Sequence, residues 1–374
     1  GRTLHRGAGL VRRGARVEAI LPLSQLPADA RRLPLAGGVV MPGFVDLQVN
    51  GGGGVMLNDA PSAETIARML TAHAGLGSAA LLPTLITDTA QTTRAAIDAA
   101  ELALARGARG LLGLHLEGPH LAVARKGAHD ARLIRPMTAQ DEAQLIEAAQ
   151  RLPNLMVTLA PETVPPARIR RLAQAGVHVF LGHSDCSYDQ AMAAFDAGAL
   201  GATHLFNAMS GLGHRAPGLV GAVLDHPGAH AGLIADAVHV HPAAMGAALR
   251  AKQRLAAVAG GGGHGQVFLV TDAMAPAGTD LPGFTLGGRA VRREAGRLTL
   301  ADGTLAGADL SLGRAVATLW ALRGVDRAQA LAMATSGPAG VLRDAMGFGH
   351  LQIGQDSPVI HLSQDGNATA LPPA

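Results

Sequence analysis

From Gly43 onward, two kinds of apolar pattern alternate along the chain. Short apolar runs, typical of buried parallel strands, are separated by stretches such as 62–74 and 92–105, where apolar positions recur every three or four residues as in amphipathic helices. Eight strand-like runs can be counted, at 44–49, 78–83, 110–116, 155–160, 177–181, 201–204, 232–235 and 266–271. This order predicts an α/β protein built as a TIM (β/α)8 barrel.

Both ends of the chain instead show brief polar and apolar alternations interrupted by glycine and proline. Because neither end can bury a core alone, we expect residues 1–42 and 338–374 to pair into one small β-sandwich domain beside a barrel domain of residues 43–337. Between the eighth run and its helix, Gly287-Gly288 and Asp302-Gly303 are turn signals that predict β-hairpins.

Composition narrows the class of protein. With 374 residues, 48% hydrophobic and 16% charged, the chain can bury a large core. Aromatic residues make up 2%, and the basic residues form no cluster, so we expect no nucleic-acid partner. The single cysteine, Cys186, excludes an intramolecular disulfide and fits a reducing compartment. No secretory signal pattern or membrane-spanning run is evident, which predicts a cytoplasmic protein without a membrane partner.

Four polar residues end apolar runs: Glu117, His183, His204 and Asp272. In a TIM barrel the catalytic groups project from these carboxyl ends. A catalytic divalent metal takes about three protein ligands, commonly imidazoles plus a carboxylate, and leaves one position open. Glu117, His183 and His204 meet that requirement. His115 lies two residues before Glu117 and so points to the same side of its strand, as a further ligand or a partner behind one.

Each of these residues also has a simpler interpretation. A lone histidine at a strand end is most often an ordinary hydrogen-bonded residue, but the combination of two histidines with a glutamate favours a metal site. Asp272 could cap a helix, although Ala275-Pro-Ala-Gly would make a poor helix start. We therefore expect Asp272 to move protons between water and a leaving group. The glycines at 51–54 lack the Gly-Lys-Ser/Thr of a phosphate-binding loop and predict a turn.

A series of motifs follows in order between about Gly37 and Gly307: Met41-Pro-Gly-Phe-Val-Asp, His115-Leu-Glu-Gly-Pro, Lys126-Gly-Ala-His129, Gly182-His-Ser, Thr203-His-Leu-Phe-Asn-Ala-Met, His214-Arg-Ala-Pro-Gly, Ile234-Ala-Asp-Ala-Val-His239 and Thr271-Asp-Ala-Met. Together they resemble the N-acetylglucosamine-6-phosphate deacetylases of the amidohydrolase superfamily. Many members of the superfamily carry His-x-His after the first strand, where this chain has Gln48-Val-Asn50. In this respect the chain resembles the members that bind a single zinc ion, so the resemblance implies one catalytic metal.

The resemblance implies a role for each matching position. Glu117, His183 and His204 would hold the zinc ion, Asp272 would be the general base and then the acid, and His129 would hydrogen-bond the acetyl carbonyl. The sugar phosphate would be bound by His239, Asn207, the backbone of Ala208, and Arg215 reaching in from a neighbouring subunit, so that a homodimer is implied.

The activity implied is hydrolysis of N-acetyl-D-glucosamine 6-phosphate to D-glucosamine 6-phosphate and acetate. The nearest alternative is the N-acetylgalactosamine 6-phosphate epimer, which differs in one hydroxyl configuration. A cyclic-amide hydrolase would bring His-x-His and a bridging lysine, whereas Lys126 lies in a loop motif. A further alternative is a catalytically inactive barrel that serves as a scaffold, but such proteins usually lose ligands that this chain keeps.

Overall fold

The computed structural model describes residues 3–258 and 264–373. Its centre is a sheet of eight parallel strands in chain order: β4 (Phe44–Val49), β7 (Ser78–Ile86), β8 (Leu114–Glu117), β9 (Leu155–Leu159), β10 (His178–Leu181), β11 (Gly201–Ala202), β12 (His230–Leu233) and β13 (Val267–Leu269). The Asp272 N–H donates to Gln48 O at 3.0 Å and the Asn50 N–H to Ala273 O at 2.8 Å, which brings the last strand against the first. The predicted barrel is therefore confirmed.

Each predicted run overlaps one of these strands. Two strands extend beyond their runs, β7 to Ile86 and β12 back to His230, and two others are clearly shorter than predicted. The third strand begins only at Leu114, because Gly110 and Gly113 have φ of 87° and 137° and bend the backbone before it. The sixth strand is limited to Gly201–Ala202, because the chain turns at His204, which has φ of 31°. This early turn is what places His204 on the rim of the barrel.

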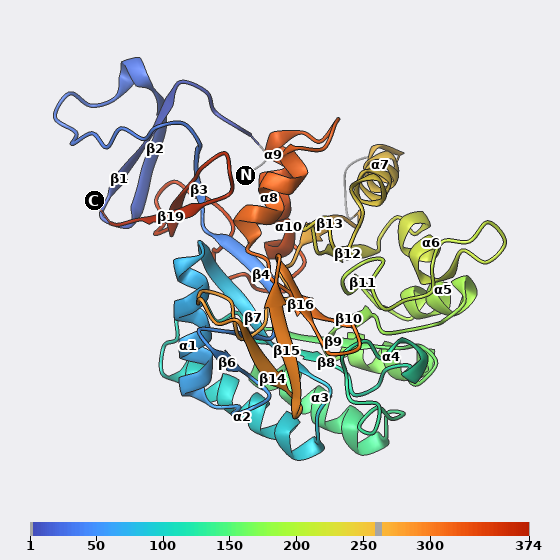
Figure 1. Cartoon of the computed structure of the whole chain (residues 1–374). Helices are drawn as coiled ribbons and strands as arrows, with labels where there is room; N and C mark the ends of the chain where they lie inside the picture. The colour runs from blue at the N-terminus through green and yellow to red at the C-terminus, as the bar shows by residue number, and fades with distance from the viewer. Residues whose placement is uncertain (1–2, 259–263, 374) are drawn as a thin grey trace.

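Helices surround the barrel strands (Figure 1): α1 (Ala63–Gly75), α2 (Ala90–Ala105), α3 (Ala139–Arg151), α4 (Pro166–Gln174), α5 (Tyr188–Asp196), α6 (Gly218–Asp225), α7 (Pro242–Val258), α8 (Leu312–Trp320), α9 (Arg327–Met333) and α10 (Ser336–Ala339). Several begin at side-chain caps. Ser62 accepts from the Thr65 N–H, and Thr138 and Asp141 form a reciprocal capping box. None of the described helices is long and apolar enough to cross a membrane.

Both chain ends form small antiparallel sheets, as expected. One sheet pairs β1 (Ala8–Arg13) with β2 (Arg16–Pro22), and the other joins β3 (Val39–Pro42), β18 (Val359–Leu362) and β19 (Ala368–Leu371). Figure 1 shows these sheets beside the barrel, close to the C-terminus. The domain boundaries proposed from the sequence remain a prediction, and α10, which includes Pro338, packs against the barrel strands β4 and β13.

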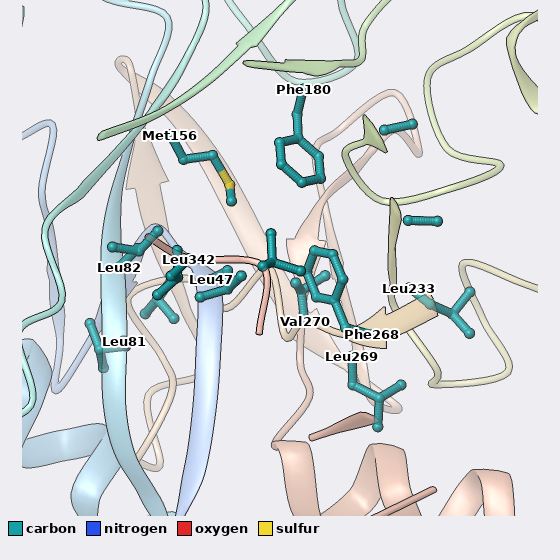
Figure 2. Close-up of a cluster of buried hydrophobic side chains, with 14 of the residues drawn as sticks. Leu47, Leu81, Leu82, Met156, Phe180, Leu233, Phe268, Leu269, Val270 and Leu342 are labelled. Carbon is teal, nitrogen blue, oxygen red and sulfur yellow. The ribbon is translucent and has the colours of Figure 1, made fainter. Parts of the chain in front are cut away.

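A large cluster of buried apolar side chains holds the barrel together. Figure 2 shows part of this cluster, including Phe180 of β10 and Phe268 of β13, whose ring centroids lie 6.2 Å apart in an edge-to-face arrangement. Leu47 and Leu342 lie in the same cluster, so a residue from beyond the predicted barrel domain contributes to its core.

Between β13 and α8 the chain forms a four-stranded antiparallel sheet, which we call the inserted sheet: β14 (Gly283–Leu286), β15 (Arg289–Glu294), β16 (Arg297–Thr299) and β17 (Leu305–Ala308). Gly287 and Gly288 have φ of 53° and 78° and make the two-residue turn that joins β14 to β15. The predicted hairpins are confirmed. The glycines after β4 also make a tight hairpin, between β5 (Gly51–Gly52) and β6 (Val55–Met56).

Candidate metal centre and active site

Three buried side chains meet at the carboxyl ends of separate strands. Glu117 ends β8, and His183 and His204 follow β10 and β11 in a left-handed backbone conformation, with φ of 47° and 31°. Glu117 Oε1 lies 3.2 Å from His183 Nε2 and 2.9 Å from His204 Nε2, and the two imidazole nitrogens are 3.1 Å apart. The structure thus brings together the three residues singled out as metal ligands.

The chemistry of this cluster suits a divalent metal. His183 donates through Nδ1 to the Arg125 carbonyl at 2.8 Å, and in that tautomer Nε2 presents a lone pair. Two imidazole nitrogens and a carboxylate oxygen then face the same position, where a cation could accept their lone pairs and balance the negative charge. Although burial opposes it, the neighbouring His183 and His204 hold the pKa of Glu117 well below its usual range. Glu117 is therefore a carboxylate at neutral pH.

His115 is not part of this cluster. Its Nε2 lies 2.8 Å from Thr158 Oγ1 and its Nδ1 lies 3.3 Å from Thr84 Oγ1, so both ring nitrogens have partners inside the barrel. Burial lowers the pKa of His115 to about 4, which leaves it neutral. The structure therefore places His115 between two threonines, outside the group of Glu117, His183 and His204.

Asp272 follows β13 and lies beside the cluster. Its Oδ1 accepts hydrogen bonds from Asn50 Nδ2 at 2.6 Å and from Gln48 Nε2 at 3.2 Å. The same Gln48 nitrogen lies 3.2 Å from Glu117 Oε2, so one carboxamide bridges the two carboxylates. Burial, together with the negative charge of Glu117, raises the pKa of Asp272 to about 6. A carboxylate with that pKa can accept and return a proton near neutral pH.

His129 lies on a loop that packs against the group of candidate metal ligands, Glu117, His183 and His204. Its ring centroid is 4.3 Å from that of His183, and its Nδ1 lies 2.7 Å from Thr87 Oγ1 and accepts from the Thr87 N–H at 3.3 Å. Burial, helped by the neighbouring His183, lowers the pKa of His129 well below its usual range. The ring is therefore neutral, and since Nδ1 accepts a backbone N–H, the proton is on Nε2. His129 thus offers one N–H donor.

The residues expected to bind the sugar phosphate lie on loops that follow β11 and β12. His239 Nδ1 lies 2.6 Å from Asp236 Oδ2 in a buried pair. Asn207 Nδ2 donates to the His204 carbonyl at 3.2 Å, and Ala208 adopts φ of 48°. Arg215 is different, because it lies on an exposed loop and its side chain makes no hydrogen bond to the described residues.

Several positioning contacts were missed from the sequence. Gln48 and Asn50 were interpreted only as the loss of a second metal site, yet both hold Asp272. Asp236 stands three residues before His239, a spacing that could have indicated the pair. Thr87 gives no local signal, because its partner His129 lies 42 residues away in sequence.

Comparisons with known proteins agree with this geometry. The amidohydrolase family model matches residues 39–360. The N-acetylgalactosamine-6-phosphate deacetylase of Shewanella sp. (strain ANA-3) is 38% identical over 344 residues, which are 92% of this chain and 84% of that protein. The N-acetylglucosamine-6-phosphate deacetylase of Vibrio furnissii is 36% identical, with 91% and 82% covered. The crystal structure of N-acetylglucosamine-6-phosphate deacetylase from Pasteurella multocida matches with a TM-score of 0.89 and 31% identity, covering 99% of this chain and 95% of that one.

Proposed function

Because the chain belongs to the amidohydrolase family, and within it to the deacetylases of N-acetylhexosamine 6-phosphates, we propose that it converts N-acetyl-D-glucosamine 6-phosphate and water to D-glucosamine 6-phosphate and acetate. The observation that carries this proposal is the position of the Asp272 carboxylate beside the buried cluster of Glu117, His183 and His204. Amide hydrolysis requires a group that transfers protons, which Asp272 supplies, and a site that polarises the carbonyl, which a metal ion held by the three ligands would supply.

We assign the metal as zinc, held by Glu117, His183 and His204, because two imidazoles and one carboxylate are a common catalytic zinc set. Once bound, such an ion polarises the amide carbonyl and lowers the pKa of water. Asp272 accepts the proton of the attacking water and then gives it to the departing amine nitrogen. Gln48 and Asn50 hold the Asp272 carboxylate during both transfers.

In this proposal, His129 donates a hydrogen bond to the acyl carbonyl oxygen. Its neutral ring carries the proton on Nε2, because Nδ1 accepts from Thr87. That N–H donates to the carbonyl oxygen as negative charge develops on it. One such donor is typically worth about 3 to 4 kcal/mol of transition-state stabilisation.

The sugar phosphate would be held by the loops that follow β11 and β12. Asp236 occupies Nδ1 of His239, which leaves Nε2 available for a sugar hydroxyl. Asn207 and the backbone of Ala208 are assigned to the phosphate. Arg215 is exposed and its side chain has no hydrogen-bond partner within the described ranges, which supports the proposal that it completes the phosphate site of a second subunit in a homodimer.

A second candidate substrate is N-acetylgalactosamine 6-phosphate. Two relatives named for this epimer are 38% and 39% identical to the chain, whereas six relatives named for the gluco epimer are 32% to 36% identical. The inactive-scaffold alternative is disfavoured, because the cluster and Asp272 are both intact.

Acetate release from metal-loaded protein tests the proposal. The two epimeric sugar phosphates and the unphosphorylated sugars are compared by kcat/KM, with Asp272→Asn as the control. We expect phosphate-dependent turnover of the gluco epimer that the control loses. A galacto preference above about tenfold would select the second candidate, and no turnover of any sugar by protein with bound metal would overturn the proposed function.

A further inference from the structure

The inserted sheet is packed against the loops that carry the active site. Its buried side chains Leu286, Val291 and Leu298 share a core, separate from that of the barrel, with Met56 of β6 and Met274, two residues after Asp272. Figure 1 shows the sheet in orange, following β13 in the chain. Because the sheet and these loops bury apolar surface together, the sheet is a fixed wall of the site.

One polar contact extends this wall to the loop of His129. From the start of β15, the half-buried Arg289 donates through Nη2 to the carbonyl oxygen of Ala128. Ala128 itself packs against the core of the inserted sheet. The residue held by Arg289 is therefore the one directly before His129.

The other side of the same loop lies against a metal ligand. Gly127 has φ of 54°, and a Cβ added there would come within 3.3 Å of His183 Cε1. The loop is thus confined between the His183 ring and the inserted sheet. Movement toward the metal cluster is blocked by contact, whereas movement away from it is opposed by the bond from Arg289.

We propose that Arg289 is a positioning residue, which holds the backbone of Ala128 and thereby sets the place of the His129 imidazole relative to the reacting carbonyl. Thr87 fixes the ring orientation and the tautomer, because both of its hydrogen bonds to His129 are to the side-chain Nδ1. Arg289 fixes the backbone from which that side chain extends. A donor displaced by about 1 Å can cost on the order of a hundredfold in rate.

This inference rests on the proposed role of His129, and the test separates the two. Acetate release is measured for Arg289→Ala, Arg289→Lys, His129→Ala and the double variant Arg289→Ala/His129→Ala. Arg292→Ala is the matched control, because Arg292 lies on the same strand, is exposed, and makes no side-chain hydrogen bond to the described residues. Hydrogen–deuterium exchange of residues 126–130 reports how firmly the loop backbone is held, without relying on activity.

We expect Arg289→Ala to lower kcat by roughly tenfold to a hundredfold with KM changed less than about threefold, and Arg289→Lys to recover part of the loss. Exchange in 126–130 rises in Arg289→Ala and not in Arg292→Ala. In the His129→Ala background, the same substitution at Arg289 has less than about a threefold further effect, because the group that Arg289 positions is already gone.

Other results would overturn the inference. Equal losses in both backgrounds would mean that Arg289 acts independently of His129, and a rise in KM confined to phosphorylated sugars would mean that it binds the phosphate directly. Unchanged exchange in 126–130 would also sink it. If His129→Ala turns over normally while that exchange does rise, the proposed role of His129 fails and Arg289 is only a support of the loop.

Discussion

The carboxamide nitrogen of Asn50 lies 2.6 Å from Oδ1 of Asp272, across the seam where the first and last barrel strands meet. Asn50 is buried and Asp272 is half-buried beside the cluster of Glu117, His183 and His204. The contact explains how a carboxylate whose pKa is raised by burial still has a defined orientation, because Asn50 and Gln48 both donate to the same oxygen.

Replacing the carboxylate of Asp272 should remove turnover without removing the metal. In Asp272→Asn we expect kcat to fall by about 10²- to 10⁴-fold or more, since the amide cannot accept a proton from water. Metal content, measured by atomic spectroscopy, should stay near that of the unaltered protein because Asp272 is outside the ligand cluster. Turnover within a few-fold of normal would remove Asp272 from the proposed mechanism.

Replacing Asn50 should shift the pH dependence. The donor at 2.6 Å favours the ionised form of Asp272, so Asn50→Leu should raise the pKa of Asp272 further. Because the ionised form is the active base, the acid limb of log kcat/KM against pH should move to higher pH. An acid limb at the same pH in both proteins, or one moved to lower pH, would contradict this assignment of the limb to Asp272.

The metal ligands and His115 should behave differently when altered. Dialysis against a chelator should abolish turnover, and zinc should restore it. In His204→Asn we expect weaker metal binding. Zinc at a hundredfold excess over the Kd of the unaltered protein should raise the free energy of unfolding of that protein by about 2.7 kcal/mol, and should raise that of the variant by less.

His115→Asn is the comparison for these ligands, because His115 is buried and bonded to Thr84 and Thr158 rather than to the cluster. It should lower the melting temperature and still bind one metal ion per chain. Loss of metal from His115→Asn together with retention by His204→Asn would reverse the ligand assignment.

Mixing two inactive variants tests whether Arg215 acts across subunits. Arg215→Ala and Asp272→Asn should each be impaired alone. In a mixed dimer, the subunit with intact Asp272 would receive an intact Arg215 from its neighbour, so one site would recover. Coexpression of the two variants with different affinity tags, followed by isolation of the mixed species, should restore turnover. A mixed dimer no more active than its parents, or a protein that stays monomeric, would place Arg215 outside this role.

Local patterns were enough to predict the eight strands, the hairpins after Gly287 and Asp302, and the three residues that converge as Glu117, His183 and His204. The reason is physical. Alternating buried strands and amphipathic helices strongly favour a parallel barrel, and a barrel brings the carboxyl ends of its strands to one rim. Residues at those ends therefore meet even when they are far apart in sequence.

Contacts between distant segments were decided only by the folded chain. Asn50 and Asp272 meet because the barrel closes, His115 finds threonine partners because of the register of β7, β8 and β9, and Arg289 reaches Ala128 because the inserted sheet packs on the site. Each depends on loop conformation and strand register to within about an ångström. Residue type and spacing do not carry that information, because side-chain hydrogen bonds weaken steeply once distance or angle departs from the favoured range.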